Sequence, residues 1–549
     1  MQLLNRFSKF LALAALCAGA AWANNPGMIQ GVVKGSDGKP VAGAYVKLID
    51  SDGLTMMVVS RAQGKFSANN LKPGKYTVQA IGGEMQSKTA SVDVSGSKPG
   101  AANLALDDQR APELAPGWRG TPGVVGGGEV WTKTPRPPLP DGPGKEIAMQ
   151  KCGQCHTYSW FLSFRASSRD DWAHLIDSMR SNIAASDGKA DDLSPEEINT
   201  LADYFWTYLK KPAVDPNSRL PRTLATGAAE RYFVVDYKVP RPEAETHEMT
   251  VGTDGNGYAG ERNGGVIAKL DPTTNTFSEI NPPAGASPRV RLGAISHGNG
   301  DTLWMADGGP NHRWLEYNVM TGAFRSFAIP KDLKGRGNGN TIRQAPNGDV
   351  WVATGGADGM TSLDPKTGKW TIFESPAGKK MGKSVGPYGF TFDNKGDVWF
   401  AEYANNAVGH VDPKTGEVDD YPIPIPNAIP RKVNTDGYGN IWVALHESGQ
   451  LLMVDPNHPD QMKNFMPPSE NPGTYSPSID TKTGYVYVTL QAVDKIDRFD
   501  PKSNTWVEYP VPYPETDIRR IEVDPKHPNR IWWTGTLSGH FGYIEVLDR

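Results

Sequence analysis

Residues 152–156 read Cys-Gly-Gln-Cys-His, a spacing of two thiols and an imidazole that is suited to one kind of chemistry. In the C-x-x-C-H pattern, the thiols bond covalently to a haem c and the histidine binds its iron. The remaining cysteine, Cys17, lies in a predicted leader, so Cys152 and Cys155 are left for the haem. A thioredoxin-type C-x-x-C is the alternative, but it needs no trailing histidine and is expected in a βαβ context, which is absent here. We therefore predict one covalent haem c, with His156 as an axial iron ligand.

The sequence around this motif predicts a small helical domain over residues 144–212. Helical sequence precedes the motif, and a second helix begins at Ser194 and runs to about residue 209. Ser194 with Glu197 three positions later is the capping-box pattern, in which each side chain satisfies a backbone N–H at the helix start. This order of helices around the motif is typical of a monohaem cytochrome.

The sixth iron ligand has to come from between these helices. A helix over residues 170–181 would carry one apolar stripe that includes Met179, with His174 on the opposite side. We therefore predict Met179 as the second axial ligand in preference to His174, although Met179 could also be a core residue. The pattern from Trp172 to Met179 resembles cytochrome domains attached to periplasmic dehydrogenases, and that resemblance implies an axial methionine.

The first 23 residues predict a secretory signal peptide. Arg6 and Lys9 precede an apolar run, and Ala21-Trp22-Ala23 is a small-x-small cleavage site before Asn24. No later stretch is long and apolar enough for a membrane span, and haem c attachment predicts a periplasmic location. The whole chain has a formal net charge of −4. The mature chain is more acidic and has no basic runs, so nucleic acid is not an expected partner.

Short alternating strands between turn signals predict a β-sandwich over residues 27–108. Its glycine and apolar pattern resembles the carboxypeptidase regulatory-like domain in four segments: Gly31–Val33, Gly38–Val46, Gly64–Phe66 and Leu71–Val78. The resemblance implies a spacer or a docking surface for a partner, and we expect the rest of the chain to fold without it. Residues 109–143 are rich in Pro and Gly and are predicted to be a linker.

After a second linker over residues 211–228, the chain repeats with a period that fits a four-stranded propeller blade. Each repeat has a turn of the same type, at Asp271, Asn318, Asp364, Asp412, Asp455 and Asp500. The last repeat ends before its fourth strand, but residues 231–240 resemble the strand that is missing. We therefore predict a seven-bladed β-propeller over residues 229–549, closed by residues 231–240. The fold class is mostly β and multidomain: a β-sandwich, a small helical cytochrome domain and a propeller.

Aligning the blades places chemically useful side chains at two positions near the channel. The first position holds His247, Asn340, Tyr388, Arg431 and Arg519, and the second holds Glu261 and Glu402. An imidazole, carboxylates and arginines around one funnel could bind and deprotonate a small anionic or phenolic molecule. In that interpretation His247, Glu261, Tyr388 and Glu402 are catalytic, while Arg431, Asn340 and Arg519 bind substrate. The alternative is that these groups only join the blades by hydrogen bonds.

The repeats resemble the virginiamycin B (streptogramin) lyase family of seven-bladed propellers. In that family one imidazole acts as base and a carboxylate helps to hold Mg²⁺, which His247 and Glu261 match in spacing. The family takes a second histidine from the neighbouring blade, where this chain has Arg519 and Arg520. That departure weakens the case for lyase chemistry.

Together these features predict a periplasmic haem c oxidoreductase or electron-transfer protein. Its propeller would bind a small-molecule substrate or redox partner, and a soluble cytochrome or cupredoxin would accept the electrons. A Mg²⁺-dependent lyase and a non-enzymatic electron shuttle are the alternatives. No flavin motif is visible, and seven blades do not favour PQQ, because quinone alcohol dehydrogenases have eight.

Overall fold

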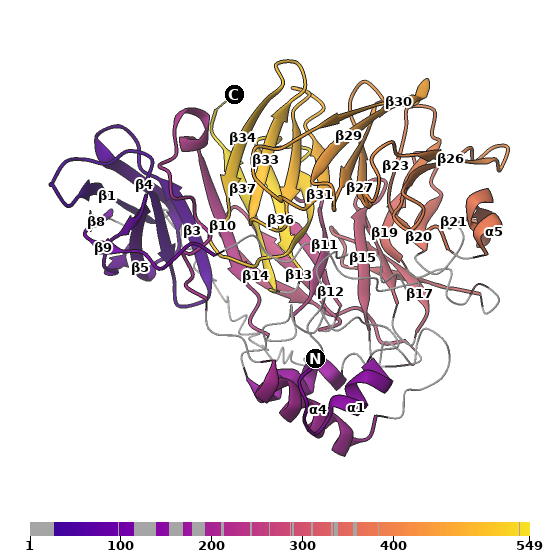
Figure 1. Cartoon of the computed structure of the whole chain (residues 1–549), viewed down its shortest axis with the longest axis horizontal. Coiled ribbons are helices and arrows are strands. Elements are labelled where there is room, and N and C mark those ends of the chain that lie inside the picture. Colours follow the sequence, from indigo (N-terminus) through magenta and orange to yellow (C-terminus); the bar gives the residue numbers. More distant parts are fainter. Residues whose placement is uncertain are drawn as a thin grey trace, which may run out of the picture.

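A computed structural model describes most of the chain (Figure 1). The described residues are 27–96, 98–114, 139–152, 168–177, 193–209, 214–241, 244–262, 264–285, 287, 290–308, 311–330, 333, 339–354, 359–382, 384–536 and 538–548. Of the haem ligands predicted above, Cys155, His156 and Met179 lie outside these ranges, as does the predicted leader. No helix among the described residues is long and apolar enough to cross a membrane.

The N-terminal region is a β-sandwich, as predicted. One sheet has the strand order β4-β1-β8, and the other runs β3-β2-β5-β6-β9 with β7 paired to β5. The strands are β1 (Gly27–Gly35), β2 (Tyr45–Ile49), β3 (Leu54–Val59), β4 (Lys65–Leu71), β5 (Gly74–Gly82), β6 (Met85–Gln86), β7 (Ala90–Val94), β8 (Gly100–Leu106) and β9 (Asp108–Gln109). Alternate residues of these strands point into a shared apolar core, which explains their period-2 sequence pattern.

The C-terminal region contains six separate four-stranded antiparallel sheets and a seventh four-stranded unit within a larger sheet. From the inside outwards, the first three sheets are β11 (Thr246–Val251), β12 (Gly257–Glu261), β13 (Ile267–Asp271) and β14 (Thr276–Ile280); β15 (Leu292–His297), β16 (Thr302–Asp307), β17 (Arg313–Asn318) and β18 (Phe324–Ala328); β19 (Gly339–Gln344), β20 (Val350–Thr354), β21 (Gly359–Asp364) and β22 (Lys369–Glu374). A short helix, α5 (Pro376–Met381), follows β22.

The remaining blades complete the ring. They are β23 (Pro387–Phe392), β24 (Val398–Glu402), β25 (Ala407–Val411) and β26 (Val418–Pro422); β27 (Pro430–Thr435), β28 (Ile441–Leu445), β29 (Gln450–Asp455) and β30 (His458–Phe465); β31 (Thr474–Ile479), β32 (Val486–Leu490), β33 (Lys495–Asp500) and β34 (Thr505–Pro510); β35 (Ile518–Val523), β36 (Arg530–Gly535), β37 (His540–Val546) and β10 (Tyr232–Lys238). Each innermost strand contacts the next one round the ring, and β35 contacts β11.

Two sequence predictions about the propeller are confirmed. Strand β10 pairs antiparallel with β37, from Tyr232 opposite Val546 to Lys238 opposite His540, and so completes the last blade. The Asp-Pro turns form as expected, because each aspartate accepts a hydrogen bond from the backbone N–H two residues later. The acceptor carboxylates belong to Asp271, Asp364, Asp412 and Asp500, with N···O distances of 2.7 to 2.9 Å.

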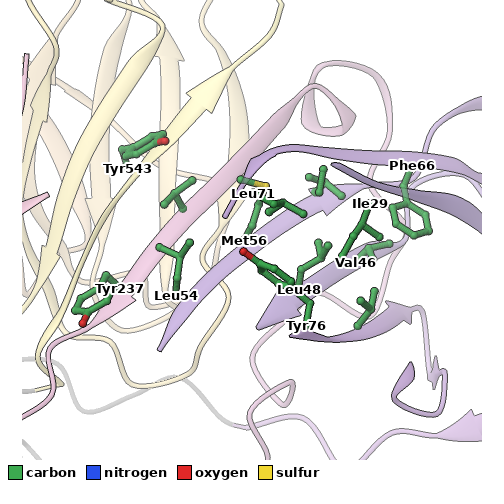
Figure 2. Packing of buried hydrophobic residues seen from close by; sticks show 14 of the residues in the cluster. Ile29, Val46, Leu48, Leu54, Met56, Phe66, Leu71, Tyr76, Tyr237 and Tyr543 are labelled. Carbon is green, nitrogen blue, oxygen red and sulfur yellow. The ribbon is translucent and has the colours of Figure 1, made fainter. Parts of the chain in front are cut away.

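The sandwich and the propeller share one ten-stranded sheet, which the sequence did not predict. Strand β3 pairs antiparallel with β10, from Val58 opposite Phe233 to Leu54 opposite Tyr237. Figure 2 shows Leu54 of the sandwich beside Tyr237 of the propeller, with Met56 farther along β3, and all three belong to one apolar cluster. This continuity argues against a separable spacer, because removing the sandwich would expose the edge of β10.

The predicted linker after residue 211 is partly buried between these two regions. Lys47 is 3% exposed, and its ammonium donates to Pro216 O, Asn217 Oδ1 and Pro512 O at 3.1, 3.0 and 2.8 Å. Arg219 forms a buried ion pair with Asp494 of the propeller, with Nε and Oδ2 3.0 Å apart. Residues of this segment therefore help to fix the sandwich against the propeller.

The helical region has a core of its own. It contains α1 (Lys145–Ile147), which continues into η2 (Ala148–Cys152), a helix over residues 169–177, and α4 (Pro195–Tyr208). The capping box at the start of α4 is confirmed: Ser194 Oγ accepts from Glu197 N at 3.2 Å, and Glu197 Oε2 accepts from Ser194 N at 2.8 Å. Trp172 is buried in the core, as the predicted stripe requires, while His174 is exposed. The core also includes Leu139, within the segment predicted as a linker.

Candidate functional site

The innermost strands of all seven blades have an irregular register near their first residues. Thr246 and Glu248 on β11 face Glu261 and Gly260 on β12, which leaves His247 between them without a ladder partner. The other six blades show a register shift at the same place. A bulge of this kind changes the direction in which neighbouring side chains point. It explains how consecutive residues, such as His247 and Glu248, can join one cluster in the channel.

Side chains from four blades form a hydrogen-bonded chain across the channel. His247 Nε2 lies 3.3 Å from Tyr388 Oη, and Tyr388 Oη lies 2.5 Å from Tyr475 Oη. His247 Nδ1 lies 3.0 Å from Glu248 Oε1, which also receives Lys432 Nζ at 2.6 Å. His247 on β11 and Tyr388 on β23 belong to the first and fourth blades, so their contact spans the ring.

The hydrogen-bond partners fix the direction of this chain. A carboxylate only accepts, so His247 carries its proton on Nδ1 and donates it to Glu248. Nε2 then accepts the hydroxyl proton of Tyr388, and Tyr388 accepts that of Tyr475. Burial, with the nearby cations Arg262, Lys432, Arg519 and Arg291, holds the pKa of His247 well below its usual value, so the ring is neutral. Burial also raises the pKa of Tyr388 well above 10, so its phenol is neutral too.

Arg431 lies against this chain, and none of the described acidic residues forms an ion pair with it. Its guanidinium lies 5.2, 5.4 and 5.7 Å from the ring centres of Tyr388, Tyr403 and Tyr475. The residue is 7% exposed, and its buried Nε has no hydrogen-bond partner in the described part of the chain. Aromatic faces attract a guanidinium, but they do not neutralise its charge. This arrangement leaves its N–H donors available for an anion.

Arg519 and Arg520 follow each other on β35 and are both paired with acids. Arg519 Nε lies 3.0 Å from Asp517 Oδ1, and its guanidinium lies 5.7 Å from the ring centre of Tyr475. Arg520 lies 2.9 Å from Glu522 and 3.8 Å from Glu248. Arg519 therefore belongs to the same cluster as Arg431, while Arg520 extends it deeper into the channel.

The two carboxylates predicted at the second position have other partners. Glu261, at the end of β12, accepts two hydrogen bonds from Arg241 at 3.0 and 2.8 Å. Glu402, at the end of β24, accepts one from Asn405 at 2.7 Å, and its other oxygen is buried with no hydrogen-bond partner among the described residues. Burial, and secondly Asp420, raises the pKa of Glu402 to about 9, so it is protonated at neutral pH. The structure therefore gives neither carboxylate a contact with His247.

The structure thus brings together four of the predicted residues: His247, Tyr388, Arg431 and Arg519. The second predicted position, at Glu261 and Glu402, is engaged elsewhere. Asn340 occupies the second place in β19, and its side chain lies outside the described part of the chain. Across the described ranges, no three His, Cys, Asp or Glu side chains are grouped closely enough to hold a metal ion.

Sequence reasoning missed several members of the cluster. Tyr475 lies fourteen residues before Thr489, which is the spacing between Tyr388 and Glu402, so blade alignment could have found it. Glu248 and Lys432 directly follow residues that were found. Their inclusion depends on the bulges, because regular strands would send adjacent side chains to opposite faces.

Comparisons with known proteins define the class of the two β regions. Residues 293–548 match the Virginiamycin B lyase family, and residues 28–107 match the Carboxypeptidase regulatory-like domain. The propeller is therefore virginiamycin B lyase-like, and the sandwich is carboxypeptidase regulatory-like. Neither match includes the helical region or His247. The comparison with curated proteins gave no match.

Among solved structures, a streptogramin B lyase matches with 18% identity and a TM-score of 0.51, over 58% of this chain and 100% of that one. The virginiamycin B lyase from Staphylococcus aureus has 17% identity and a TM-score of 0.49, covering 57% and 99% of the two chains. Hydrazine synthase from Kuenenia stuttgartiensis has 11% identity and a TM-score of 0.45, covering 57% and 98%. At 18% identity, the first match shows a shared fold.

Proposed function

We propose that this chain is a periplasmic haem c oxidoreductase or electron-transfer protein whose propeller binds a small anionic or phenolic molecule. The observation that carries the binding part is Arg431, a buried guanidinium that is surrounded by tyrosine rings and has no acidic partner among the residues that the structure describes. A buried cation is costly unless a partner neutralises it. An anionic ligand would supply that partner, and the tyrosine faces would contact its apolar body.

The neighbouring residues give the site a route for a proton. The hydroxyl of Tyr388 donates to neutral His247, whose other nitrogen is held by Glu248. A ligand that gives a proton to Tyr388 would therefore pass one to His247, and Glu248 would stabilise the imidazolium that forms. His247 acts through Tyr388 in this proposal, because both of its nitrogens are engaged and it is 1% exposed.

The described part of the helical region fits the attachment of a haem. Cys152 ends η2, is half-buried and packs against the apolar core of that region. Cys152 and Cys155 would hold the haem, and His156 and Met179 would bind its iron. When bound, the haem would accept and release single electrons. A soluble periplasmic cytochrome or cupredoxin would then take those electrons from the protein.

The binding site can be tested on the purified full-length holoprotein with benzoate and phenol as probes. We expect benzoate to bind with measurable affinity by isothermal titration calorimetry. Arg431→Gln should weaken binding by about 30-fold or more, as expected for the loss of a desolvated charge contact. Arg325→Gln is the matched control, because Arg325 is exposed on the outer strand β18. Equal binding by the Arg431→Gln and wild-type proteins would overturn the proposed site.

A lyase of the streptogramin type is the second candidate, and the family match over residues 293–548 favours it. The two functions require different assays. An oxidoreductase should reduce its haem when a panel of periplasmic substrates is added, and a chelator should have no effect. A lyase should act without an electron acceptor and should lose activity with a chelator. A protein that binds the probes but shows neither activity would be a non-enzymatic shuttle.

A further inference from the structure

A groove of about 1170 Å³ lies between the sandwich and the last blade of the propeller. The sandwich lines it with residues of β1, β4 and β8, and the propeller lines it with residues of β10, β36 and β37 (Figure 1). Lining residues run along β4 from Lys65 to Asn70, so the groove follows this strand for most of its length. Its volume exceeds the roughly 300–1,000 Å³ of typical small-molecule pockets. The size and course of the groove therefore suit an extended chain.

Strand β4 has a free edge in this groove. In the sheet β4-β1-β8, it pairs with β1 on one side, and no described strand pairs with its other side. The backbone C=O of Lys65 accepts from the N–H of Arg61 at 2.7 Å, so the backbone polar groups of Lys65 point away from β1. These groups alternate in direction along an antiparallel strand. The N–H and C=O of Ser67 therefore also face the free side, where they can pair with another strand.

The free edge is recessed, which limits what can reach it. Asn70 Nδ2 donates to Pro272 O of the first blade at 3.3 Å, and Asn275 Nδ2 donates to Asn70 O at 2.9 Å. These contacts hold the end of β4 against the propeller, while Phe233 and Tyr543 line the groove from the last blade. A single extended segment can enter such a groove. A second copy of this chain would offer a β4 that is recessed in the same way, so the two edges would not meet.

The charges that line the groove select the occupant further. Arg61 and Lys65 are exposed, and neither forms an ion pair within the described part of the chain. The third cation, Arg530, lies 2.9 Å from Glu545, which is the only acid among the described lining residues. The groove therefore has an excess of two positive charges, although the whole chain has a formal net charge of −4. This excess favours an acidic occupant.

We propose that the groove binds an extended acidic segment of a partner protein, which adds to the free edge of β4 as a further strand. The backbone of the segment would pair with the N–H and C=O of Ser67, and its carboxylates would lie near Arg61 and Lys65. Alternate side chains of a strand point to opposite faces, so its apolar side chains would contact Val58 and Phe233. In this mode of recognition the main-chain hydrogen bonds supply affinity, and the side chains supply specificity.

The test uses fluorescein-labelled peptides in which alternating valine and threonine carry two acidic residues at one end or the other. Fluorescence anisotropy with the full-length holoprotein would measure their binding. A peptide with lysines in place of the acids should bind about 5-fold to 10-fold more weakly, because the groove lacks acids to pair with it. Two further peptides are N-methylated at alternate residues, in the two possible registers. One of them should lose binding, because only one set of its N–H groups faces β4.

Substitutions in the groove locate the bound peptide. Ser67→Pro removes the outward N–H while leaving the ladder to β1, so it should weaken binding about 10-fold or more. Ser67→Ala keeps that N–H and should bind like the wild type. Replacing Arg61 and Lys65 together by Glu should weaken binding about 10-fold. Lys88→Glu is the matched control, because Lys88 is exposed and outside the groove.

Hydrogen exchange of residues 65–71 distinguishes strand addition from loose attraction, because a paired edge exchanges more slowly. Thermal unfolding would verify that each variant is folded, and the N-methylated peptides test the pairing even if Ser67→Pro does not fold. Strand addition is wrong if both N-methylated peptides bind like the parent, or if exchange of residues 65–71 is unchanged. The preference for an acidic partner is wrong if the lysine peptide binds equally well. Protection that rises with protein concentration, without peptide, would show that a second copy occupies the edge instead.

Discussion

The two regions that precede the propeller are attached to it in opposite ways. The sandwich continues the sheet of the last blade through the pairing of β3 with β10, and two apolar clusters contain residues from both regions. The apolar core of the helical region is formed from residues 139–209 alone among those described. A region that completes a sheet edge becomes part of the fold it joins. A region with a separate core can be exchanged or can unfold independently.

Of the changes considered, deleting residues 27–108 should have the largest effect on the stability of the propeller. The deletion exposes the edge of β10 and opens both shared apolar clusters, so we expect an insoluble product or the loss of the propeller's cooperative unfolding transition. Deleting residues 139–209 and joining the ends with a flexible linker should leave that transition in place. Differential scanning calorimetry of the two deletion variants would show which of them keeps the propeller's unfolding transition. A sandwich-free chain that folds cooperatively would contradict the structural role of β3.

Cys152→Ala should remove the covalent haem without disturbing the β regions. The variant lacks one of the two thiols that would bond to the haem, so we expect loss of the haem spectrum that survives acidic acetone. Cys152 is half-buried against the separate core of the helical region, so the propeller's unfolding temperature should stay unchanged. Cys155→Ala should behave in the same way. Wild-type protein whose colour is fully extracted by acidic acetone would rule out covalent attachment. A large fall in the propeller's unfolding temperature would instead show that the helical region supports it.

Lys47 should make the stability of the joined sandwich and propeller depend on pH. Burial lowers its pKa from 10.5 to about 7. Between these two values the unfolded chain therefore binds more protons than the folded chain, and the free energy of unfolding should rise with pH. The slope is at most about 1.4 kcal/mol per pH unit for one such group. Lys47→Met should flatten this rise in urea denaturation measured from pH 7 to 10. An unchanged slope would mean that Lys47 stays charged on its three acceptors.

The smallest expected effect is in the helical region. Ser194→Ala removes the cap of α4 and should cost about 1 kcal/mol, whereas Ser194→Thr should keep most of it. Because the helical core is separate, the loss should appear in the circular dichroism transition of the helices and leave the propeller transition in place. A matching shift of both transitions would show that the two regions unfold together.

Much of the fold could be predicted because it depends on local patterns. The Asp-Pro turns, the capping box at Ser194 and the resemblance of residues 231–240 to the missing strand each involve residues close in sequence or repeated along it. The pairing of the sandwich with the propeller was not predicted. Its pairing with β10 joins segments that are far apart in the chain, and an alternating strand pattern is the same whether its edge is free or paired.

For the candidate site, the sequence by itself determined which chemical groups are available: a C-x-x-C-H motif, an imidazole at residue 247, and arginines and tyrosines at repeated positions. It also identified the ring position shared by His247, Tyr388, Arg431 and Arg519. The tertiary structure alone decided which of these groups meet. Contacts across the channel are made between blades that are distant in sequence, and the bulges turn Glu248 and Lys432 toward the same cluster. The ion pair between Lys432 and Glu248 depends on a distance in space, and no spacing along the chain encodes that distance.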